Sequence, residues 1–215
     1  AIPAITAQNS QGVHYVEQIS ATGLANQLQV LADDVLPCAI KIGVLPSVEC
    51  INRVVDFLSR QTTITVIFDP VLAPTQGQRF VDDVTREALK TLLPLIDLFT
   101  PNIPEAEQLT GMSITDTQSQ WLAAQALVNM GASAVLLKGG HGNRDCCQDV
   151  FYSREHDFWL TQKKQNTAHS HGTGCVLSSA IAAFIAHGKA LRDAVVLANA
   201  YISKGLQLAT ALDAA

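Results

Sequence analysis

The chain has 215 residues, of which 48% are hydrophobic and 15% are charged, and its formal net charge is −5. This length and apolar content suffice for one sizeable core, which favours a single α/β domain over two domains. The acidic balance and the lack of basic runs argue against nucleic acid and anionic membranes as partners. An anionic ligand must therefore be bound by local groups.

The cysteines indicate the redox state of the chain. There are five of them, Cys38, Cys50, Cys146, Cys147 and Cys175. Their odd number and irregular spacing predict reduced thiols and no disulfide framework. The sequence contains no Cys-x-x-Cys pair with matching histidines, so we do not predict a structural zinc site. Because no signal peptide or membrane-spanning run is evident either, we expect a soluble, cytoplasmic protein.

The first part of the chain combines a strand, a turn and a helix. The apolar residues of 1–7 predict a strand in progress, and the polar residues from Gln8 to Val13 predict a turn after it. A helix is predicted from about 20 to 33, with Ser20 or Thr22 as its cap. Its apolar face is expected to hold Leu24, Leu28 and Leu31.

Strands and helices then alternate along the chain. Strands are predicted at 37–43, 63–68, 98–100 and 134–137, and helices at about 48–58, 81–93, 104–110 and 115–130. This alternation implies parallel strands joined by right-handed crossovers, with helices on both faces of the sheet. Residues 149–152 and 158–160 predict an antiparallel hairpin at the sheet edge. We therefore predict a three-layer α/β/α sandwich with a mainly parallel central sheet, spanning residues 1–215 as one domain.

Polar residues follow several of these strands, at the edge where such sheets bind ligands. Asp69 follows one strand, Asn102 and Glu105 the next, and Lys138 and Gly139 the last parallel one. Carboxylates suit Mg²⁺, and a lysine beside glycine can approach and neutralise phosphate. Structural alternatives stay open: Asp69 as a turn residue, and Glu105 as a first-turn acid that favours the helix dipole.

Two polar connections are predicted near this edge. Residues 72–82 form a long connection that is a candidate mobile loop. Residues 161–170 lack regular periodicity and can bend over a bound nucleotide.

Residues 171–185 change from a glycine-rich turn directly into an apolar helix. Gly172 and Gly174 allow a tight turn and a close approach of backbone to ligand. A helix that begins near Cys175 points its unsatisfied N–H groups at the same place. The stretch predicts an anion site that contains a thiol. A glycine-broken loop before a core helix is the alternative.

His171-Gly172-Thr173-Gly174-Cys175, followed by Leu-Ser-Ser-Ala-Ile-Ala-Ala, resembles the signature of the hydroxymethylpyrimidine and phosphomethylpyrimidine kinases of the ribokinase-like superfamily. The last residue of this motif is usually aspartate in that superfamily but cysteine in these pyrimidine kinases. Cys175 therefore favours the pyrimidine kinases over other members of the superfamily. The resemblance runs from Thr6-Ala7-Gln8-Asn9 to the final helix and covers nearly the whole chain.

The sequence departs from the family pattern at two places. Family members begin with an earlier strand and a glycine-rich segment that closes over the substrate, and we expect a kinase domain that lacks both. They also carry Asn-Thr directly before the motif, whereas Asn166-Thr167 is followed here by three further residues that include His169. His169 therefore has no assigned role.

The resemblance implies ATP-dependent, Mg²⁺-assisted phosphorylation of 4-amino-5-hydroxymethyl-2-methylpyrimidine, its monophosphate, or both, in thiamine biosynthesis. It also implies a homodimer. Cys175 would accept the proton of the substrate hydroxyl, and we expect the helix N-terminus to lower the pKa of its thiol. The implied catalytic residues are Cys175, Gly172, Thr173 and Gly174; the substrate-binding residues Gln8, Val44 and Cys175; the nucleotide-binding residues Lys138, Gly139, Asn102 and Thr173; and the metal-binding residues, through water, Glu105 and Asp69.

Three alternatives remain at this point. A pyridoxine or pyridoxal kinase is the nearest enzymatic one, and a non-catalytic pyrimidine- or nucleotide-binding module is the one from another class. The third alternative concerns Cys175 alone, which would be an inert packing residue with no role in catalysis. A cysteine hydrolase is weaker, because no acid is available to orient His171 and the context of a nucleophile elbow is missing.

Overall fold

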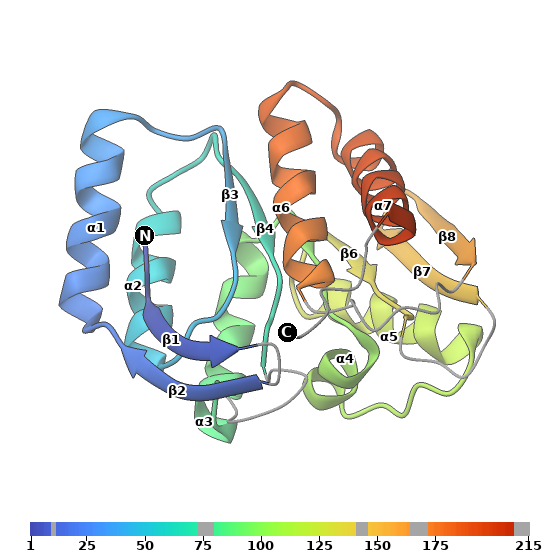
Figure 1. Ribbon diagram of the computed structural model, residues 1–215, viewed down its shortest axis with the longest axis horizontal. Coiled ribbons are helices and arrows are strands. Elements are labelled where there is room, and N and C mark those ends of the chain that lie inside the picture. Colours follow the sequence, from blue (N-terminus) through green and yellow to red (C-terminus); the bar gives the residue numbers. More distant parts are fainter. Residues whose placement is uncertain (10–11, 73–79, 141–145, 164–171, 209–215) are drawn as a thin grey trace, which may run out of the picture.

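The computed structural model describes residues 1–9, 12–72, 80–140, 146–163 and 172–208 (Figure 1). Its main sheet has six strands in the order β3-β4-β5-β6-β7-β8. The first four are parallel, and β7 and β8 are antiparallel to their neighbours. This result confirms a mainly parallel sheet with a hairpin at one edge. The strands are β3 (Ala39–Ile42), β4 (Thr65–Phe68), β5 (Leu98–Phe99), β6 (Ala134–Leu137), β7 (Cys146–Ser153) and β8 (Asp157–Lys163).

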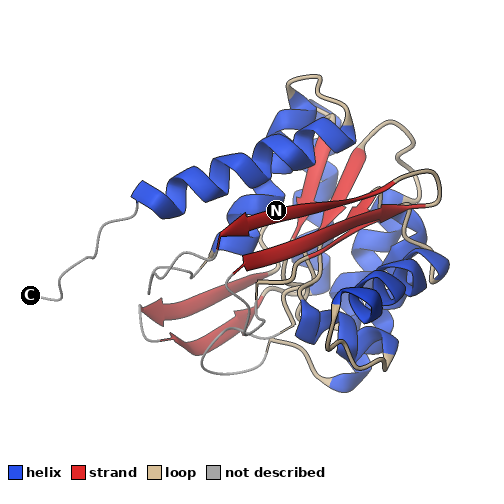
Figure 2. Ribbon diagram, turned by 90° about the vertical axis from the view of Figure 1, so that its right-hand side faces the viewer, coloured by secondary structure: helices blue, strands red, loops and turns tan. Residues whose placement is uncertain are grey.

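Helices cover both faces of this sheet (Figure 2). Because right-handed crossovers advance in one direction along the strand order, the connecting helices fall on one face. That face holds α1 (Ala21–Asp34), α2 (Val48–Leu58), α3 (Asp83–Ala88), the 3₁₀ helix η1 (Leu89–Leu95), α4 (Ile103–Thr110) and α5 (Thr117–Asn129). After the β7–β8 hairpin the chain returns over the other face as α6 (Thr173–Ala186) and α7 (Leu191–Leu208). The α/β/α prediction is confirmed.

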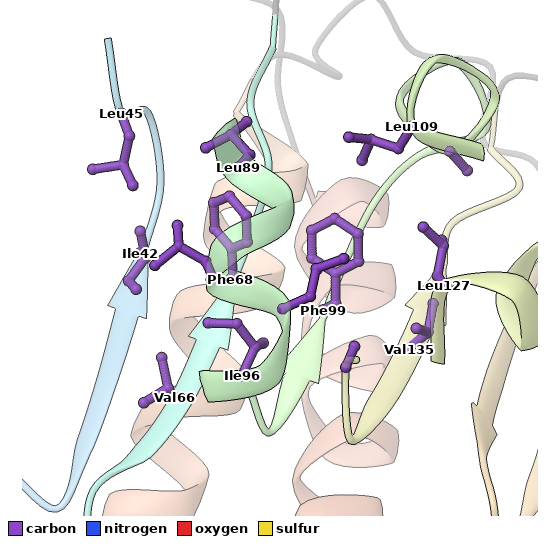
Figure 3. Close-up of a cluster of buried hydrophobic side chains, with 14 of the residues drawn as sticks. Ile42, Leu45, Val66, Phe68, Leu89, Ile96, Phe99, Leu109, Leu127 and Val135 are labelled. Carbon is purple, nitrogen blue, oxygen red and sulfur yellow. The ribbon is translucent and has the colours of Figure 1, made fainter. Parts of the chain in front are cut away.

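Each strand divides its side chains between two hydrophobic cores, because successive side chains point to opposite faces. Phe68, Phe99 and Val135 lie in the core on the α2 and α5 side, which Figure 3 shows. The neighbouring Ile67 and Leu98 lie in the second core, on the α6 and α7 side. The alternation therefore determines which residues can reach the start of α6.

The amino-terminal residues form a hairpin outside the main sheet, below β3 in the view of Figure 1. Strand β1 (Ala4–Asn9) pairs antiparallel with β2 (Gly12–Gln18). The predicted bounds of the turn, Gln8 to Val13, were too wide, because Gln8 lies in β1 and Val13 in β2. The β-branched and aromatic residues from Val13 to Val16 favour a strand, and this signal was missed.

Two helix predictions also need correction. Ser20 caps α1 as expected, accepting from the Gly23 N–H at 3.1 Å, but Leu31 is 53% exposed and does not join the core. The single helix expected at 81–93 is divided into α3 and η1. Pro94 lies inside η1; it has no N–H to donate to the carbonyl four residues earlier, so η1 cannot continue as a regular α-helix through it.

All five cysteines are free thiols, as predicted. In the described part of the chain, no three His, Cys, Asp or Glu side chains form a group that could hold a metal. The described helices also include none with the length and hydropathy needed to cross a membrane. Most of the polar connection at 72–82, and His169, lie outside the described residues.

Candidate active site

Four polar side chains point toward α6 from neighbouring strands. The last residues of β4, β5 and β6 belong to the core on the opposite face. The residues that follow them, Asp69, Thr100 and Lys138, therefore turn toward α6. Lys41 lies one residue before the end of β3 and points the same way, since Ile42 belongs to the opposite core. The helix α6 packs over β3 and β4.

Asp69 is the centre of this cluster. Its carboxylate is 2% exposed and accepts from Lys138 Nζ at 2.9 Å and from Ser178 Oγ at 3.1 Å. Thr100 Oγ1 is 3.4 Å from the first carboxylate oxygen, and Lys41 Nζ is 3.8 Å from the second. Two ammonium groups and two hydroxyls therefore compensate one buried charge, as a buried carboxylate requires.

The start of α6 faces this cluster. Gly172 is the N-cap and has φ of 78°, a left-handed conformation that favours glycine. Ser178, one turn into the helix, joins α6 to Asp69. A Cβ atom on Gly174 would lie 3.1 Å from Lys138 Nζ. The first-turn N–H groups have no partner within the helix. Together with the lysines, they can bind a phosphate group at the helix N-terminus.

Cys175 lies in the same first turn and is exposed. Contrary to our expectation, the pKa of its thiol is raised above the ordinary value. Desolvation by the surrounding protein is the largest cause, and the negative charge of Asp69 and a hydrogen bond to it act in the same direction. Lys41 and Lys138 oppose the shift but do not reverse it. The thiol is therefore protonated at neutral pH in this ligand-free state.

Asn102 and Glu105 form the capping box of α4. Asn102 Oδ1 accepts from the Glu105 N–H at 2.9 Å, and Glu105 Oε2 accepts from the Asn102 N–H at 2.8 Å. The backbone of Asn102 also forms an isolated parallel β-bridge with Lys138, which places the capping box beside the Asp69 cluster. Glu105 is 6% exposed, and burial raises the pKa of its carboxyl group to about 7, although Lys138 and the Asn102 N–H oppose the shift.

This pKa predicts how stability depends on pH. A folded-state pKa of about 7, above the ordinary value of 4.5, means that stability from the neutral carboxyl is present at low pH. It is lost as pH rises through about 7. Glu105→Gln cannot ionise, so its melting temperature should gain on that of the parent as the pH rises from about 4.5 to about 7 and stay ahead by a constant amount above that, in EDTA and without nucleotide. The full change in the free energy of unfolding of the parent relative to Glu105→Gln is up to about 3 kcal/mol.

The exposed first-turn acid of α2 provides the control, since Glu49→Gln should show the same pH profile as the parent. A Glu105→Gln variant that follows the parent at every pH would contradict the buried neutral carboxyl.

The backbone after β6 is held from two sides. The Gly139 N–H donates to Asp149 Oδ1 at 2.9 Å, and Gln120 Nε2 donates to the carbonyl oxygens of Leu137 at 3.1 Å and Gln148 at 2.8 Å. Burial raises the pKa of the Asp149 carboxyl, while the Gly139 N–H and Lys138 lower it. These contacts hold the backbone on both sides of Lys138, at Leu137 and Gly139.

Gly139 also permits a close approach between β6 and β7. A Cβ atom there would lie 2.1 Å from the carbonyl oxygen of Gln148, whereas a Cβ atom on Gly140 would lie 3.9 Å from Cys147 Sγ. Gly139→Ala should therefore destabilise the fold by about 2–4 kcal/mol, in the range of strongly strained substitutions, and Gly140→Ala by less than about 1 kcal/mol. Urea unfolding of the two variants checks this, and equal midpoints would contradict it.

The predicted substrate residues lie on other elements. Gln8 is exposed in β1, and Val44 is half-buried just after β3. Gln18 Nε2 donates to the Pro46 carbonyl at 3.4 Å, which brings β2 to the segment that contains Val44. The described contacts do not join Gln8 to the Asp69 cluster. His141, His169 and His171 lie outside the described residues.

Several residues of the cluster were not predicted from the sequence. Thr100 and Ser178 are both 0% exposed and contact Asp69, but a hydroxyl after a strand or within a helix carries no distinctive signal. Lys41 did carry a sequence signal, because it is a charged residue between two isoleucines in an otherwise apolar strand. Asp149 sits similarly in an otherwise largely apolar part of β7.

Comparison with known proteins gives consistent results. The family model described as phosphomethylpyrimidine kinase matches residues 1–214. A hydroxymethylpyrimidine/phosphomethylpyrimidine kinase of Haemophilus influenzae is 39% identical over 211 residues, which cover 96% of this chain and 78% of the relative.

Solved structures agree in fold. A phosphomethylpyrimidine kinase from Clostridium difficile has a TM-score of 0.82 and 32% identity, over 95% of this chain and 84% of that chain. A pyridoxal kinase from Staphylococcus aureus in complex with AMP-PCP has a TM-score of 0.89 and 27% identity, over 99% of this chain and 78% of that chain.

Proposed function

The chain belongs to the phosphomethylpyrimidine kinase family, and we propose that it transfers a phosphoryl group from ATP to 4-amino-5-hydroxymethyl-2-methylpyrimidine, its monophosphate, or both. The reaction is a step of thiamine biosynthesis. The observation that supports it best is the meeting of Asp69, Lys138 and Cys175 at the start of α6. Phosphoryl transfer needs positioning and stabilisation of charge, and this cluster offers both.

The donor phosphates lie at the N-terminus of α6 in this proposal. The first-turn N–H groups of Thr173, Gly174 and Cys175 bind the transferred group, and Lys138 neutralises its charge. Asp69 holds the Lys138 ammonium at 2.9 Å. Gly139, Asn102 and Thr173 complete the nucleotide side. The reaction then needs a group that takes the proton of the acceptor.

Cys175 takes that proton. With the alcohol as acceptor, the hydroxyl oxygen bonds to phosphorus, the bond to the departing ADP breaks, and the hydroxyl proton moves to the Cys175 sulfur. With the monophosphate as acceptor, an ionised phosphate oxygen bonds to phosphorus as ADP departs, and no hydroxyl proton is removed. Only the thiolate can accept the proton of the alcohol. Since the pKa of the free thiol is raised, the active fraction grows with pH. Gln8 and Val44 hold the pyrimidine ring, with the Gln8 amide offering a donor and an acceptor to its edge.

Mg²⁺ fits this site through water. Among the described residues no three acids converge on a point, and Asp69 and Glu105 are already hydrogen-bonded. Such a site suits an ion that keeps its waters and is held by one or two carboxylates and by phosphates. The bound ion would neutralise charge on the ATP phosphates. Asp69 and Glu105 would orient its waters.

We expect Glu105→Gln to weaken Mg²⁺-dependent ATP binding, because an amide holds the waters of a cation less strongly than a carboxylate. Calorimetry with ATP, in Mg²⁺ and in EDTA, measures the effect. Glu49→Gln is again the control. Equal Mg²⁺-dependent affinities of Glu105→Gln and the parent would exclude this role for Glu105.

The proposed function is tested by turnover of ATP with three acceptors side by side: the hydroxymethylpyrimidine, its monophosphate and pyridoxal. We expect phosphorylated pyrimidine, identified by mass spectrometry, at a much higher kcat/KM than phosphorylated pyridoxal. A preference for pyridoxal would favour the related kinase activity. Binding of ATP and pyrimidine without turnover would favour a non-catalytic module. The homodimer and the cytoplasmic location stay predictions, which sedimentation and fractionation can test.

A further inference from the structure

Lys41 is a cation within an apolar strand. Its neighbours in β3 are Ile40 and Ile42, and it pairs in register with Ile67 of β4. Its side chain is 19% exposed. A charge in such surroundings carries a cost in desolvation, and an aliphatic residue would suit the strand better. We therefore expect the charge of Lys41 to interact with a ligand or with another charged group of the protein.

The pairing of Lys41 within the protein is weak. Its Nζ atom is 3.8 Å from Asp69 Oδ2, beyond hydrogen-bond distance. The same carboxylate is held more closely by Lys138 at 2.9 Å and by Ser178 at 3.1 Å. Within the described residues, Asp69 is the one acid in an ion pair with Lys41. Because two ammonium groups share this carboxylate, the cluster has positive charge available for an anion.

The two lysines approach different oxygens of the Asp69 carboxylate, Lys138 Nζ the Oδ1 atom at 2.9 Å and Lys41 Nζ the Oδ2 atom at 3.8 Å. Lys138 follows β6 and precedes Gly139, on the nucleotide side of the proposed site. Lys41 comes from β3, and its Nζ atom lies 2.9 Å from the place of a Cβ atom on Gly43, the residue before Val44. Cys175 lies close enough to both lysines for their charges to act on its thiol. Because the proposed function assigns Val44 to the pyrimidine ring, Lys41 is the cation nearer to the acceptor in that proposal.

We propose that Lys41 binds the phosphate group of the monophosphate acceptor and so determines the preference of the enzyme for the second phosphorylation. The inference rests on the proposed function. The hydroxymethylpyrimidine is a neutral alcohol, whereas its monophosphate brings a dianion to the same place. A charge-assisted hydrogen bond from Lys41 distinguishes the two, because the alcohol has no group that can use the ammonium charge equally well.

The test is the ratio of kcat/KM for the monophosphate to kcat/KM for the alcohol. Lys41→Met keeps the length of the side chain and removes its charge. The ratio should fall by about 10–150-fold, which corresponds to the loss of one hydrogen bond to a charged group. Lys41→Arg keeps the cation and should keep most of the ratio. Lys189→Met, at an exposed lysine, is the matched control, and circular dichroism shows that each variant is folded.

Calorimetry adds a readout without turnover, because Lys41→Met should lose affinity for the monophosphate but much less for the alcohol. An equal loss of kcat/KM for both acceptors would overturn the inference, and so would a parent that phosphorylates the alcohol alone. A parent that phosphorylates neither pyrimidine would instead contradict the proposed function.

Discussion

Replacing Cys175 by alanine should lower turnover of the hydroxymethylpyrimidine alcohol about 10²–10⁴-fold, the usual effect of losing a general base. The affinity for ATP should stay nearly unchanged, because the N–H groups at the start of α6 belong to the backbone and remain in place. A turnover assay at saturating ATP measures the loss of activity, and calorimetry with ATP measures the affinity separately. Cys38→Ala is the matched control, since Cys38 is also an exposed free thiol but lies outside the cluster.

The pH profile sharpens this prediction. Because the pKa of the Cys175 thiol is raised, the thiolate is scarce at neutral pH and increases above it. The kcat/KM of the parent should therefore rise as the pH moves into the alkaline range, and that rise should disappear in Cys175→Ala. Unchanged turnover in this variant would leave Cys175 as a packing residue.

Gly174→Val should damage ATP binding and turnover together. A Cβ atom at Gly174 would lie 3.1 Å from Lys138 Nζ and 4.0 Å from Asp69 Oδ2, and the branched side chain would occupy the place of the bound phosphate. We expect both the ATP affinity and kcat to fall at least about tenfold, as expected when a charged hydrogen bond is lost. Calorimetry and steady-state kinetics measure the two losses.

Gly205→Val provides the comparison, because Gly205 is also a helical glycine and a Cβ atom there meets nothing within 4 Å. It should bind and turn over ATP like the parent. A Gly174→Val variant that loses turnover but keeps full ATP affinity would contradict a phosphate site at the start of α6.

The sequence predicts much of this fold because its signals are local. The alternation of apolar strands and helices is sufficient for the parallel sheet, and the glycines before Cys175 are sufficient to locate the start of α6. The hairpin of β1 and β2 was missed in part because Gln8 and Gly12 are typical of a turn, while pairing with a second strand is a tertiary effect. Pro94 accounts for the lack of α-helical geometry near the end of η1, because it has no N–H to donate, whereas the end of α3 at Ala88 has no such signal in the sequence.

The candidate site could be predicted where residues follow strands. Asp69 and Lys138 each end a strand, and parallel strands bring such ends together. Their direct ion pair, and the contacts of Thr100 and Ser178 with Asp69, depend on packing between distant segments. The pKa of Cys175 was predicted in the wrong direction, because the helix N-terminus is visible in the sequence and the desolvation and the nearby Asp69 are not.

The central claim is that the acceptor and ATP meet at Cys175. Alkylation of the cysteines tests it most directly, with mass spectrometry reporting the rate at each residue. The hydroxymethylpyrimidine together with a non-hydrolysable ATP analogue should strongly slow alkylation of Cys175 and leave Cys38 unaffected, although both thiols are exposed in the free protein. If calorimetry shows both ligands bound while Cys175 is still alkylated at the rate of the free protein, the reaction does not occur at this cluster.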